Sequence, residues 1–389
     1  MAEAMGGSVG GSIGGSIGGS IGGSIGGSIG GSIGGSIGSL ADGYASPLYA
    51  QGLIRHRGAA IDLGELSPPW TLSNRAEGAS RLFHWDAWVR NTLCVHELLR
   101  HLDFDVTPST SRQGSAVTLR AYTAASPVGV DIAKIVAPSM DVFEQQIEQV
   151  LCWADLREER SPEILTQIDN QHCFWGMLIP IHTDRMRFTR ELLEVAVQAT
   201  IFIEMRFKHE LGCWRPTDFS PQVQPMVTTP GHASLPSGHC TQSYVIHRVL
   251  SALLNADASK PGCASLLHQF DRIAERVSVN RVIAGLHFPV DNVAGRALGT
   301  ALGAYVVHCC VGADAPPCCA VFDGASYVAE DGFDPLRQIL FASKEPQATF
   351  YGSSQDQVDN IITVPSPAIL GSLWDKARRE VLELGLQFA

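Results

Sequence analysis

Apolar side chains recur at helical spacing through most of the chain. Residues 140–154 (MDVFEQQIEQVLCWA) carry one apolar stripe, which predicts an amphipathic helix. Residues 192–207 (LLEVAVQATIFIEMRF) are apolar on nearly every side, which predicts a central, buried helix. Further helices are expected at 240–254, 264–283, 289–310 and 373–384, the last of them ending before Gly385.

Patterns typical of strands are scarce in this sequence. Alternating apolar and polar positions are limited to short candidates near 117–122. Residues 43–78 are rich in proline, glycine and serine, which predicts irregular structure. The sequence therefore predicts a mainly α fold, built as a helical bundle.

The first 42 residues differ from the rest because the tetrapeptide GGSI repeats along them. The chain entropy of glycine opposes both helix and strand, so we expect a disordered tail at 1–42 and a single α-helical domain at 43–389. The even period also allows a second interpretation. In an extended chain every isoleucine of the repeat lies on one face, which would make a self-associating ribbon.

Composition narrows the range of functions. The chain has 389 residues, of which 45% are hydrophobic and 17% charged, so it can bury a sizeable core. Its formal net charge of −11 argues against the broad basic surface that nucleic acid or an anionic membrane requires. A small basic pocket is still compatible with that charge. We therefore expect a small anionic molecule as the partner, and no nucleic acid.

The longest apolar run, 297–313, is too short and too interrupted by glycine to predict a membrane span. It lies between Arg296 and Asp314 and is expected to form a core helix. No secretory signal pattern opens the chain, so the expected location is the cytoplasm. The sequence leaves a homo-oligomer open.

Ten cysteines are too few for a small disulfide scaffold in a chain of this length. The adjacent pairs Cys309–Cys310 and Cys318–Cys319 invite comparison with a zinc site. Neighbouring cysteines do not form the C-x-x-C hairpin that points two thiolates at one ion. Buried or inert thiols are the favoured interpretation.

The stretch PSGH at 236–239 predicts a tight loop that delivers a histidine to the start of a helix. A helix N-terminus presents free N–H groups, so such a loop suits an oxyanion. The Ser237 hydroxyl and the Gly238 N–H would be donors, and His239 would be close enough for proton transfer. The alternative is an ordinary helix start beside a surface histidine.

Two cations, Lys208 and Arg215, lie seven residues apart near the end of the apolar helix. Placing them there is costly unless an anion or carboxylates compensate their charge. The alternative is that they are solvated or paired with Glu204 and Glu210.

In the stretch NRVIAGLHFPVDN, Arg281 ends one helix, Gly285 breaks it, and His287 precedes the next helix. Asp291 lies four residues after His287, where it can accept a ring N–H, fix the tautomer and make the other nitrogen more basic. That describes an oriented nucleophile or ligand. A helix-capping aspartate beside a core histidine is the alternative.

Together the three segments resemble, in order and spacing, the signature of the type 2 phosphatidic acid phosphatase and vanadium haloperoxidase superfamily. The signature is a lysine seven residues before Arg-Pro, then PSGH, then an arginine six residues before a histidine with an aspartate four residues beyond. The resemblance covers 208–295 and implies the family's helical bundle. Asn280 stands where the family usually has serine, so one minor oxyanion contact is not carried over.

The resemblance implies one pocket for phosphate or vanadate. In it Ser237 and Gly238 donate hydrogen bonds, His239 is the acid/base, and His287 bonds to phosphorus or vanadium with the support of Asp291. The cations that would neutralise the oxyanion are Lys208, Arg215 and Arg281.

Two chemistries can use such a pocket. His232, seven residues before His239, and Trp214 in the WRP sequence are similar to features of haloperoxidases, where they are candidates for the halide site or for supporting residues. Together with the lack of membrane spans they favour a soluble, vanadium-dependent haloperoxidase-like enzyme, with vanadate as cofactor on His287 and peroxide and halide as substrates.

The stretch HFPVDNVAG is similar to the HxPxDxxAG of many phosphatases. The alternative is therefore a phosphatase that hydrolyses phosphate monoesters through a phosphohistidine at His287 and needs no cofactor. A third interpretation is a non-catalytic oxyanion-binding or scaffold protein, which would lack a catalytic group. Both histidines and Asp291 are present.

Overall fold

The computed structural model of the chain describes residues 47–60, 78–108, 114–123, 126–168, 171–256, 259–312, 319–327 and 368–388. The predicted tail at 1–42 lies outside these residues.

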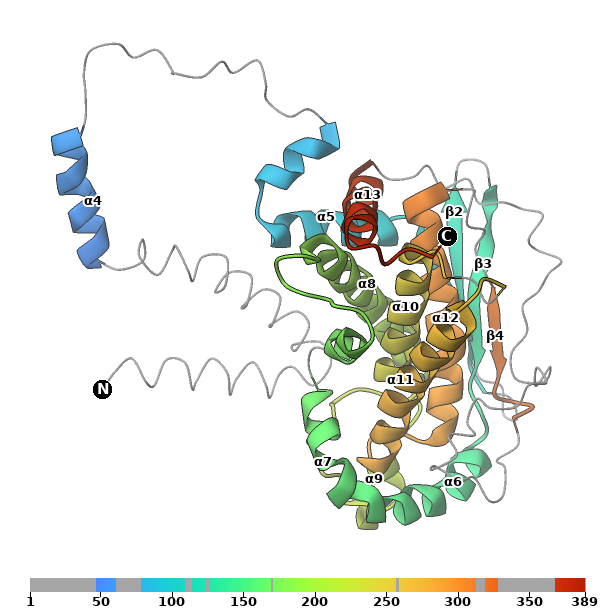
Figure 1. The fold of residues 1–389 in the computed structure, drawn as a ribbon. Coiled ribbons are helices and arrows are strands. Elements are labelled where there is room, and N and C mark those ends of the chain that lie inside the picture. Colours follow the sequence, from blue (N-terminus) through green and yellow to red (C-terminus); the bar gives the residue numbers. More distant parts are fainter. Residues whose placement is uncertain are drawn as a thin grey trace.

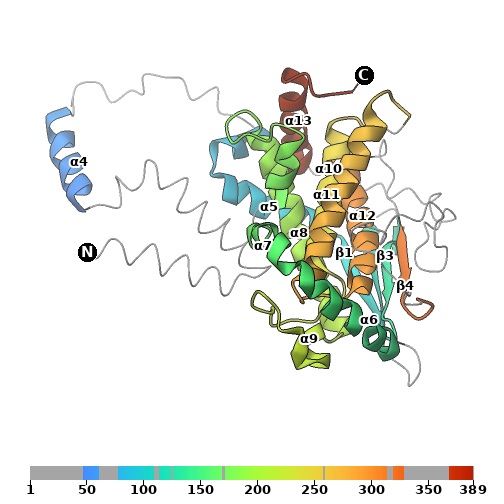
Figure 2. The same cartoon turned by 60° about the horizontal axis from the view of Figure 1, so that its bottom comes forward.

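A bundle of helices forms most of the described part of the chain (Figure 1). The long central helix α8 contacts α5, α10 and α13, while α10 packs on α11 and α12. Short helices gather at one end of the bundle, which comes forward in Figure 2. The bundle helices are α5 (Ala87–Leu99), α8 (Arg187–Leu211), α10 (Gly238–Leu253), α11 (Cys263–Ile283), α12 (Pro289–Val311) and α13 (Ala368–Glu383). The remaining helices are α4 (Pro47–Ala60), η3 (Gly78–His84), α6 (Met140–Trp153), η4 (Ala154–Leu156), α7 (Arg157–Thr166), η5 (Gln171–Met177), α9 (Pro216–Phe219) and η6 (Pro221–Val223).

The predicted helices are confirmed with small shifts of their ends. The largest shifts are in α8, which begins five residues earlier than expected at Arg187, and in α13, which begins at Ala368. The expectation of irregular structure at 43–78 was wrong for 47–60, which form α4. This helix is weakly amphipathic and therefore gives no apolar stripe to recognise.

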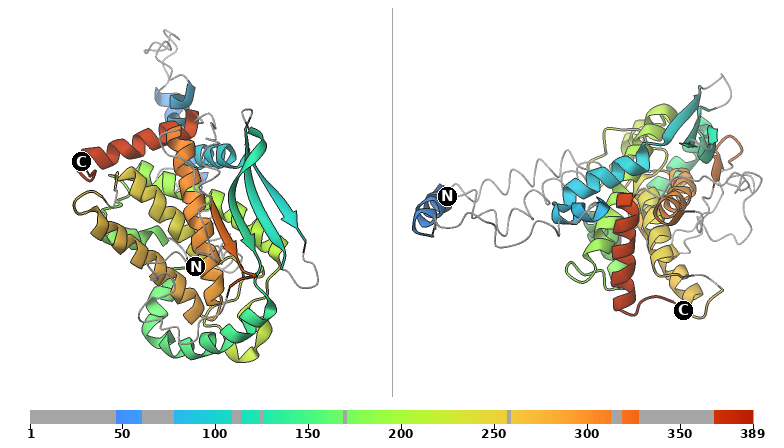
Figure 3. Two further views of the ribbon diagram at one scale, coloured as in Figure 1. Left: turned by 90° about the vertical axis from the view of Figure 1, so that its right-hand side faces the viewer. Right: turned by 90° about the horizontal axis from the view of Figure 1, so that it is seen from above.

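A four-stranded sheet lies along one side of the bundle (Figures 1 and 3). Its order is β1-β2-β3-β4, antiparallel between the first three strands and parallel between β3 and β4, and it packs on α12 and α8. The strands are β1 (Leu102–Thr107), β2 (Ala116–Thr123), β3 (Ser126–Val136) and β4 (Ala320–Asp323).

The mainly helical class is therefore confirmed, but the sequence analysis underestimated the strand content. The candidate near 117–122 is β2, whereas β1, β3 and β4 were missed. β1 and β4 have only six and four residues, too few to establish an alternating pattern. β4 also pairs with a strand far away in the sequence, and local reasoning does not detect such pairing.

The predicted core helix at 289–310 is α12, and nearly all of its side chains are buried. Glycines at every fourth position let α12 approach α10 closely. A Cβ at Gly299 would lie 2.3 Å from the carbonyl oxygen of Thr241, and one at Gly303 would lie 2.5 Å from Arg248 Cβ. The glycines that interrupt the apolar run thus serve helix packing.

Gly299→Ala is expected to lower the free energy of unfolding by about 1–3 kcal/mol, because the new methyl group overlaps a backbone oxygen of α10 that cannot move aside. Gly176→Ala is the matched control, since a Cβ there meets nothing within 4 Å. Chemical denaturation of both variants measures the difference. Equal stability of the two would contradict close packing at Gly299.

Charged side chains connect α8 to its neighbours. Arg90 of α5 forms a buried ion pair with Glu191 at 2.7 Å. Glu380 of α13 accepts hydrogen bonds at 2.9 Å from the backbone N–H groups of Phe188 and Thr189 in the first turn of α8. These contacts hold the N-terminal end of α8 and leave its C-terminal end for the site.

The cysteines of the described residues form no disulfide with one another. Cys309 and Cys310 are buried in α12, and Cys319 is partly buried. Cys318 lies outside the described residues. Within the described ranges no group of His, Cys, Asp and Glu side chains is placed to hold a metal ion, so the structure gives no support to a zinc site there.

Among the residues that the structure describes, no helix is both long and apolar enough to cross a bilayer.

Candidate active site

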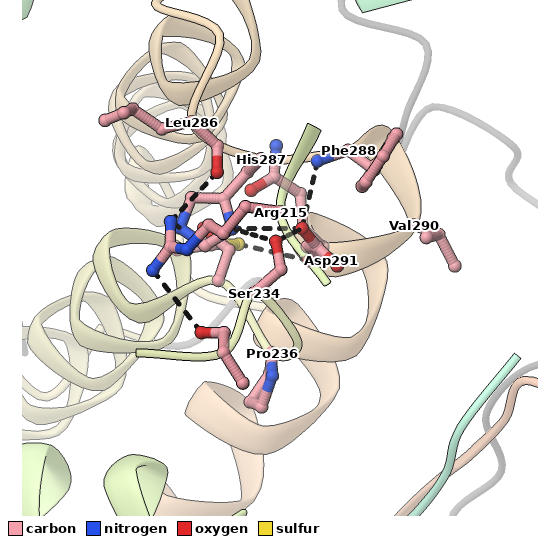
Figure 4. A network of polar contacts seen from close by, with 12 residues as sticks. Arg215, Ser234, Pro236, Leu286, His287, Phe288, Val290 and Asp291 are labelled. Carbon is pink, nitrogen blue, oxygen red and sulfur yellow. Dashed lines mark hydrogen bonds and ion pairs between the residues drawn. The ribbon is translucent and has the colours of Figure 1, made fainter. Parts of the chain in front are cut away.

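Four helix ends bring the three sequence motifs together. Lys208 lies in the last turn of α8, Ser237 immediately precedes α10, Arg281 lies in the last turn of α11, and Asp291 lies in the first turn of α12. The Ser237 N–H donates to the Asp291 carbonyl at 2.9 Å, so the PSGH loop is fastened to α12. The side chains at these helix ends are buried, and Figure 4 shows Arg215, Ser234, His287 and Asp291 close together in one network of polar contacts.

His287 is held in one tautomer by its neighbours (Figure 4). Its Nδ1 lies 3.0 Å from Asp291 Oδ2, and its Nε2 lies 3.2 Å from Arg215 Nη1. A guanidinium can only donate, so Nε2 accepts and carries the lone pair, while Nδ1–H donates to the carboxylate. This is the arrangement of an oriented nucleophile or metal ligand.

Asp291 combines both predicted roles. Its Oδ2 also accepts from the Phe288 N–H at 2.9 Å, which caps α12, and from the Ser234 hydroxyl at 2.5 Å. Burial raises the pKa of Asp291 to about 6, and the hydrogen bond from Ser234 opposes that rise. The capping alternative is thus correct, and the same carboxylate still orients His287.

Arg215 is buried beside His287 and makes no ion pair within the described residues. Its Nη1 donates to the Leu286 carbonyl at 2.9 Å and its Nε to the His232 carbonyl at 3.0 Å. Burial lowers the pKa of this guanidinium to about 10, which still leaves it charged at neutral pH. The suggestion that Arg215 is solvated was wrong, and Glu210 instead pairs with Arg206.

The Lys208 ammonium is also buried, and it holds the loop before PSGH. It donates to the carbonyls of Ser234 at 2.7 Å, Ala233 at 3.3 Å and Pro236. These three acceptors match its three N–H donors, so an anion would have to take over the weakest bond, to Ala233. Glu204, one turn earlier on α8, is fully buried, and burial raises the pKa of its carboxyl group to about 7.

The PSGH loop presents an unpaired hydroxyl. Ser237 is fully buried, and its hydroxyl has no hydrogen-bond partner among the described residues. Gly238 begins α10 against the Glu204 carboxyl group, where a Cβ would lie 2.8 Å from Oε1. A side chain at 238 would force the Glu204 carboxyl group to shift, and glycine allows this close approach without that displacement.

His239 follows in the first turn of α10, and it is buried rather than on the surface. Its Nε2 lies 3.0 Å from the Gln167 carbonyl oxygen. A carbonyl can only accept, so Nε2 bears a proton and Nδ1 is the nitrogen left to exchange one. Burial, and next the charge of Arg281, hold the pKa of His239 well below its ordinary value.

Arg281 is buried without an opposite charge beside it in the described part of the chain. It is 1% solvent-accessible, its Nε has no partner, and no carboxylate among the described residues pairs with it. Its Nη2 donates to two neutral oxygens, Ile164 O at 3.0 Å and Gln167 Oε1 at 3.1 Å. A buried cation without a counter-charge is costly, so the arrangement suits an anionic ligand.

A scan against protein families places these residues in a known context. Residues 192–313 match the PAP2 superfamily. The matched segment runs from α8 to the end of α12 and contains all three motifs. The sheet strands β1 to β3, together with α6 and α7, precede the PAP2 segment.

No curated protein matches the chain. Among solved structures, the chain is similar to the first transmembrane PAP2 type phosphatidylglycerolphosphate phosphatase from Bacillus subtilis. The identity is 19%, the alignment covers 42% of this chain and 84% of that one, and the TM-score is 0.33.

Two further candidates lie at the edge of the PAP2 motifs. His232 Nδ1 is 3.1 Å from Arg215 Nη2, so this histidine contacts the site, and burial lowers its pKa to about 4. Trp214 is 57% exposed and packs edge-on against Phe219, with 5.9 Å between the ring centroids. The structure thus brings His232 into the site and leaves Trp214 at the surface.

Three residues outside the predicted set belong to the site. Ser234 bonds to Asp291 and lies 3.3 Å from His287 Nδ1, Glu204 lies under Gly238, and Gln167 contacts His239 and Arg281. Ser234 precedes the PSGH loop by only two residues and could have been suspected from that proximity. Gln167 precedes the PAP2 segment and carries no motif.

Proposed function

We propose that this chain is a phosphatase of the PAP2 type that hydrolyses phosphate monoesters through a phosphohistidine at His287. The observation that carries the proposal is Arg281, a fully buried cation with an unpaired Nε and no carboxylate partner in the described chain. A dianionic phosphoryl group supplies the missing counter-charge. The match of 192–313 to the PAP2 superfamily supports the same conclusion.

In the first step the lone pair on His287 Nε2 attacks phosphorus. Asp291 accepts the Nδ1–H bond and stabilises the positive charge that develops on the ring. Arg215 Nη1, which now contacts Nε2, would turn its N–H to a phosphoryl oxygen. The Arg281 Nε–H, the Ser237 hydroxyl and the Gly238 N–H would stabilise the charge on the equatorial oxygens.

His239 then protonates the leaving alkoxide through Nδ1 as the ester P–O bond breaks. In the second step it takes a proton from a water that attacks phosphorus, the P–N bond to His287 Nε2 breaks, and inorganic phosphate is released. Burial, and next the charge of Arg281, lower the pKa of His239, so its ring is neutral before substrate binds. A bound dianion offsets the charge of Arg281 and raises that pKa. The proton for the leaving group therefore arrives with substrate binding.

A second candidate is the vanadium-dependent haloperoxidase expected from the sequence. The specific observation in its favour is His232 beside Arg215, where a further imidazole could act on a halide or peroxide. Vanadate shares the charge and shape of phosphate, so the unpaired donors fit it equally well, and His287 Nε2 would be its protein ligand. Bound vanadate would supply the activation of peroxide.

One purified sample divided between two assays tests the proposal. We expect hydrolysis of 4-nitrophenyl phosphate that orthovanadate inhibits, and no bromination of an activated diketone when vanadate, bromide and peroxide are supplied together. Bromination that rises with vanadate and is blocked by phosphate would favour the peroxidase. Phosphate binding without turnover in either assay would leave a non-catalytic binding protein.

A further inference from the structure

The C-terminal end of α7 contacts residues of the candidate site, although α7 lies outside the matched PAP2 segment. Gln167, the residue after α7, is 1% exposed and makes two contacts to catalytic candidates. Its backbone carbonyl accepts from His239 Nε2 at 3.0 Å, and its side-chain Oε1 accepts from Arg281 Nη2 at 3.1 Å. One residue therefore touches both the acid/base candidate and the buried cation.

A separate set of bonds fixes Gln167 in place. Asn280 Nδ2, which stands where the family usually has serine, donates at 3.0 Å both to Gln167 Oε1 and to Glu163 Oε2. Glu163 also forms a two-pronged ion pair with Arg276, at 2.7 and 2.6 Å. α7 is thereby locked against α11, and Asn280 serves this contact.

The acceptors offered to Arg281 are chemically unusual for a buried guanidinium. Both Ile164 O and Gln167 Oε1 are neutral, whereas a buried arginine is ordinarily paired with a carboxylate. A carboxylate would satisfy the same N–H group but would also cancel the charge. Neutral acceptors fix the direction of the guanidinium and leave its positive charge for a ligand.

We propose that Gln167 is a positioning residue that orients Arg281 and His239 while keeping the site cationic. This inference rests on the proposed function, because it takes Arg281 as a phosphate ligand and His239 as the proton donor. It assigns a role to a segment that carries none of the PAP2 motifs.

Gln167→Glu separates this role from a structural one. The carboxylate keeps two oxygen acceptors in nearly the same volume, so the fold should persist. Its charge should weaken phosphate and vanadate binding, and raise KM for 4-nitrophenyl phosphate, by about tenfold or more, since one opposing charge acts on a buried cation. A carboxylate also favours the imidazolium form of His239, so the limb of the pH–rate profile that belongs to His239 should move to higher pH.

Two comparison variants complete the experiment. Gln269→Glu adds the same charge at an exposed position of α11 and should change neither KM nor the pH profile. Gln167→Met removes the acceptor without adding charge, so it should lower kcat by misorienting Arg281 and leave the pH limb in place. Wild-type KM and pH profile in Gln167→Glu, combined with loss of activity and stability in Gln167→Met, would overturn the proposal and leave a purely structural residue.

A titration of His239 by NMR keeps the test independent of turnover. In the free protein the His239 ring of Gln167→Glu should titrate about one pH unit or more above that of wild type. If wild type hydrolyses no phosphate ester, the proposed function fails, and an unchanged His239 titration would reject the role of Gln167 separately. A shifted titration together with weakened vanadate binding would support it.

Discussion

His287→Ala is expected to lower kcat for aryl phosphate hydrolysis by about four orders of magnitude or more, because the variant has no atom to attack phosphorus. The geometry leaves no obvious substitute. His232 contacts the other terminal nitrogen of Arg215, Nη2, and the exchangeable nitrogen of His239 is assigned to the leaving group. Steady-state kinetics at saturating substrate measures the loss.

The same variant also distinguishes the covalent mechanism from direct attack by water. Wild type quenched during turnover should carry an acid-labile, alkali-stable phosphoryl group on His287, and the alanine variant should carry none. His209→Ala, at an exposed position beside Lys208, is the control and should retain both turnover and labelling. Full activity in the His287 variant would remove this residue from the mechanism.

Helical periodicity was sufficient to predict the bundle because its helices are long and carry apolar stripes or fully apolar faces. α6, α8 and α12 follow directly from that pattern. The sheet could not be predicted as well, since its shortest strands are too short to show alternation and β4 is completed by distant pairing. Periodicity reports a local face, whereas strand pairing is a property of the whole fold.

The candidate site was predictable for a different reason. Each motif residue lies at a helix end, and helix ends offer unpaired backbone groups that suit oxyanions. The spacing of Arg281, His287 and Asp291 then placed them at the junction between two helices. It could not show that Lys208 bonds to three loop carbonyls, because those contacts depend on how the loop folds back on α8.

The role of Gln167 could not be predicted from the sequence. Its contact with Arg281 joins residues 114 positions apart, and an isolated glutamine has no pattern that signals it. The physical signal appears only in three dimensions, as a buried cation whose acceptors are all neutral. A substitution of Arg281 is therefore expected to lower activity strongly without lowering stability.

Arg281→Met is expected to lower kcat/KM by about three orders of magnitude, because the variant loses a charged donor aimed at the transferring phosphoryl group. Its stability should nevertheless remain unchanged or increase. The guanidinium is buried, and burial lowers its pKa to about 10. No carboxylate in the described chain offsets the free-energy cost of its desolvation. Methionine removes this desolvation cost, which stabilises the folded state. The loss of the hydrogen bonds to Ile164 and Gln167 opposes that gain.

Steady-state kinetics measures the loss of kcat/KM, and chemical denaturation with and without inorganic phosphate measures the stability and the phosphate binding of each variant. Phosphate should stabilise the wild type, since a ligand that binds only the folded state adds RT ln(1 + [L]/Kd), and should stabilise Arg281→Met much less. Arg281→Lys keeps the charge but not the fork of donors, so it should lie between the two. A methionine variant that loses stability in step with activity would show that Arg281 serves the fold. Stability gained as activity disappears is the result expected if the wild-type cation is kept for its ligand.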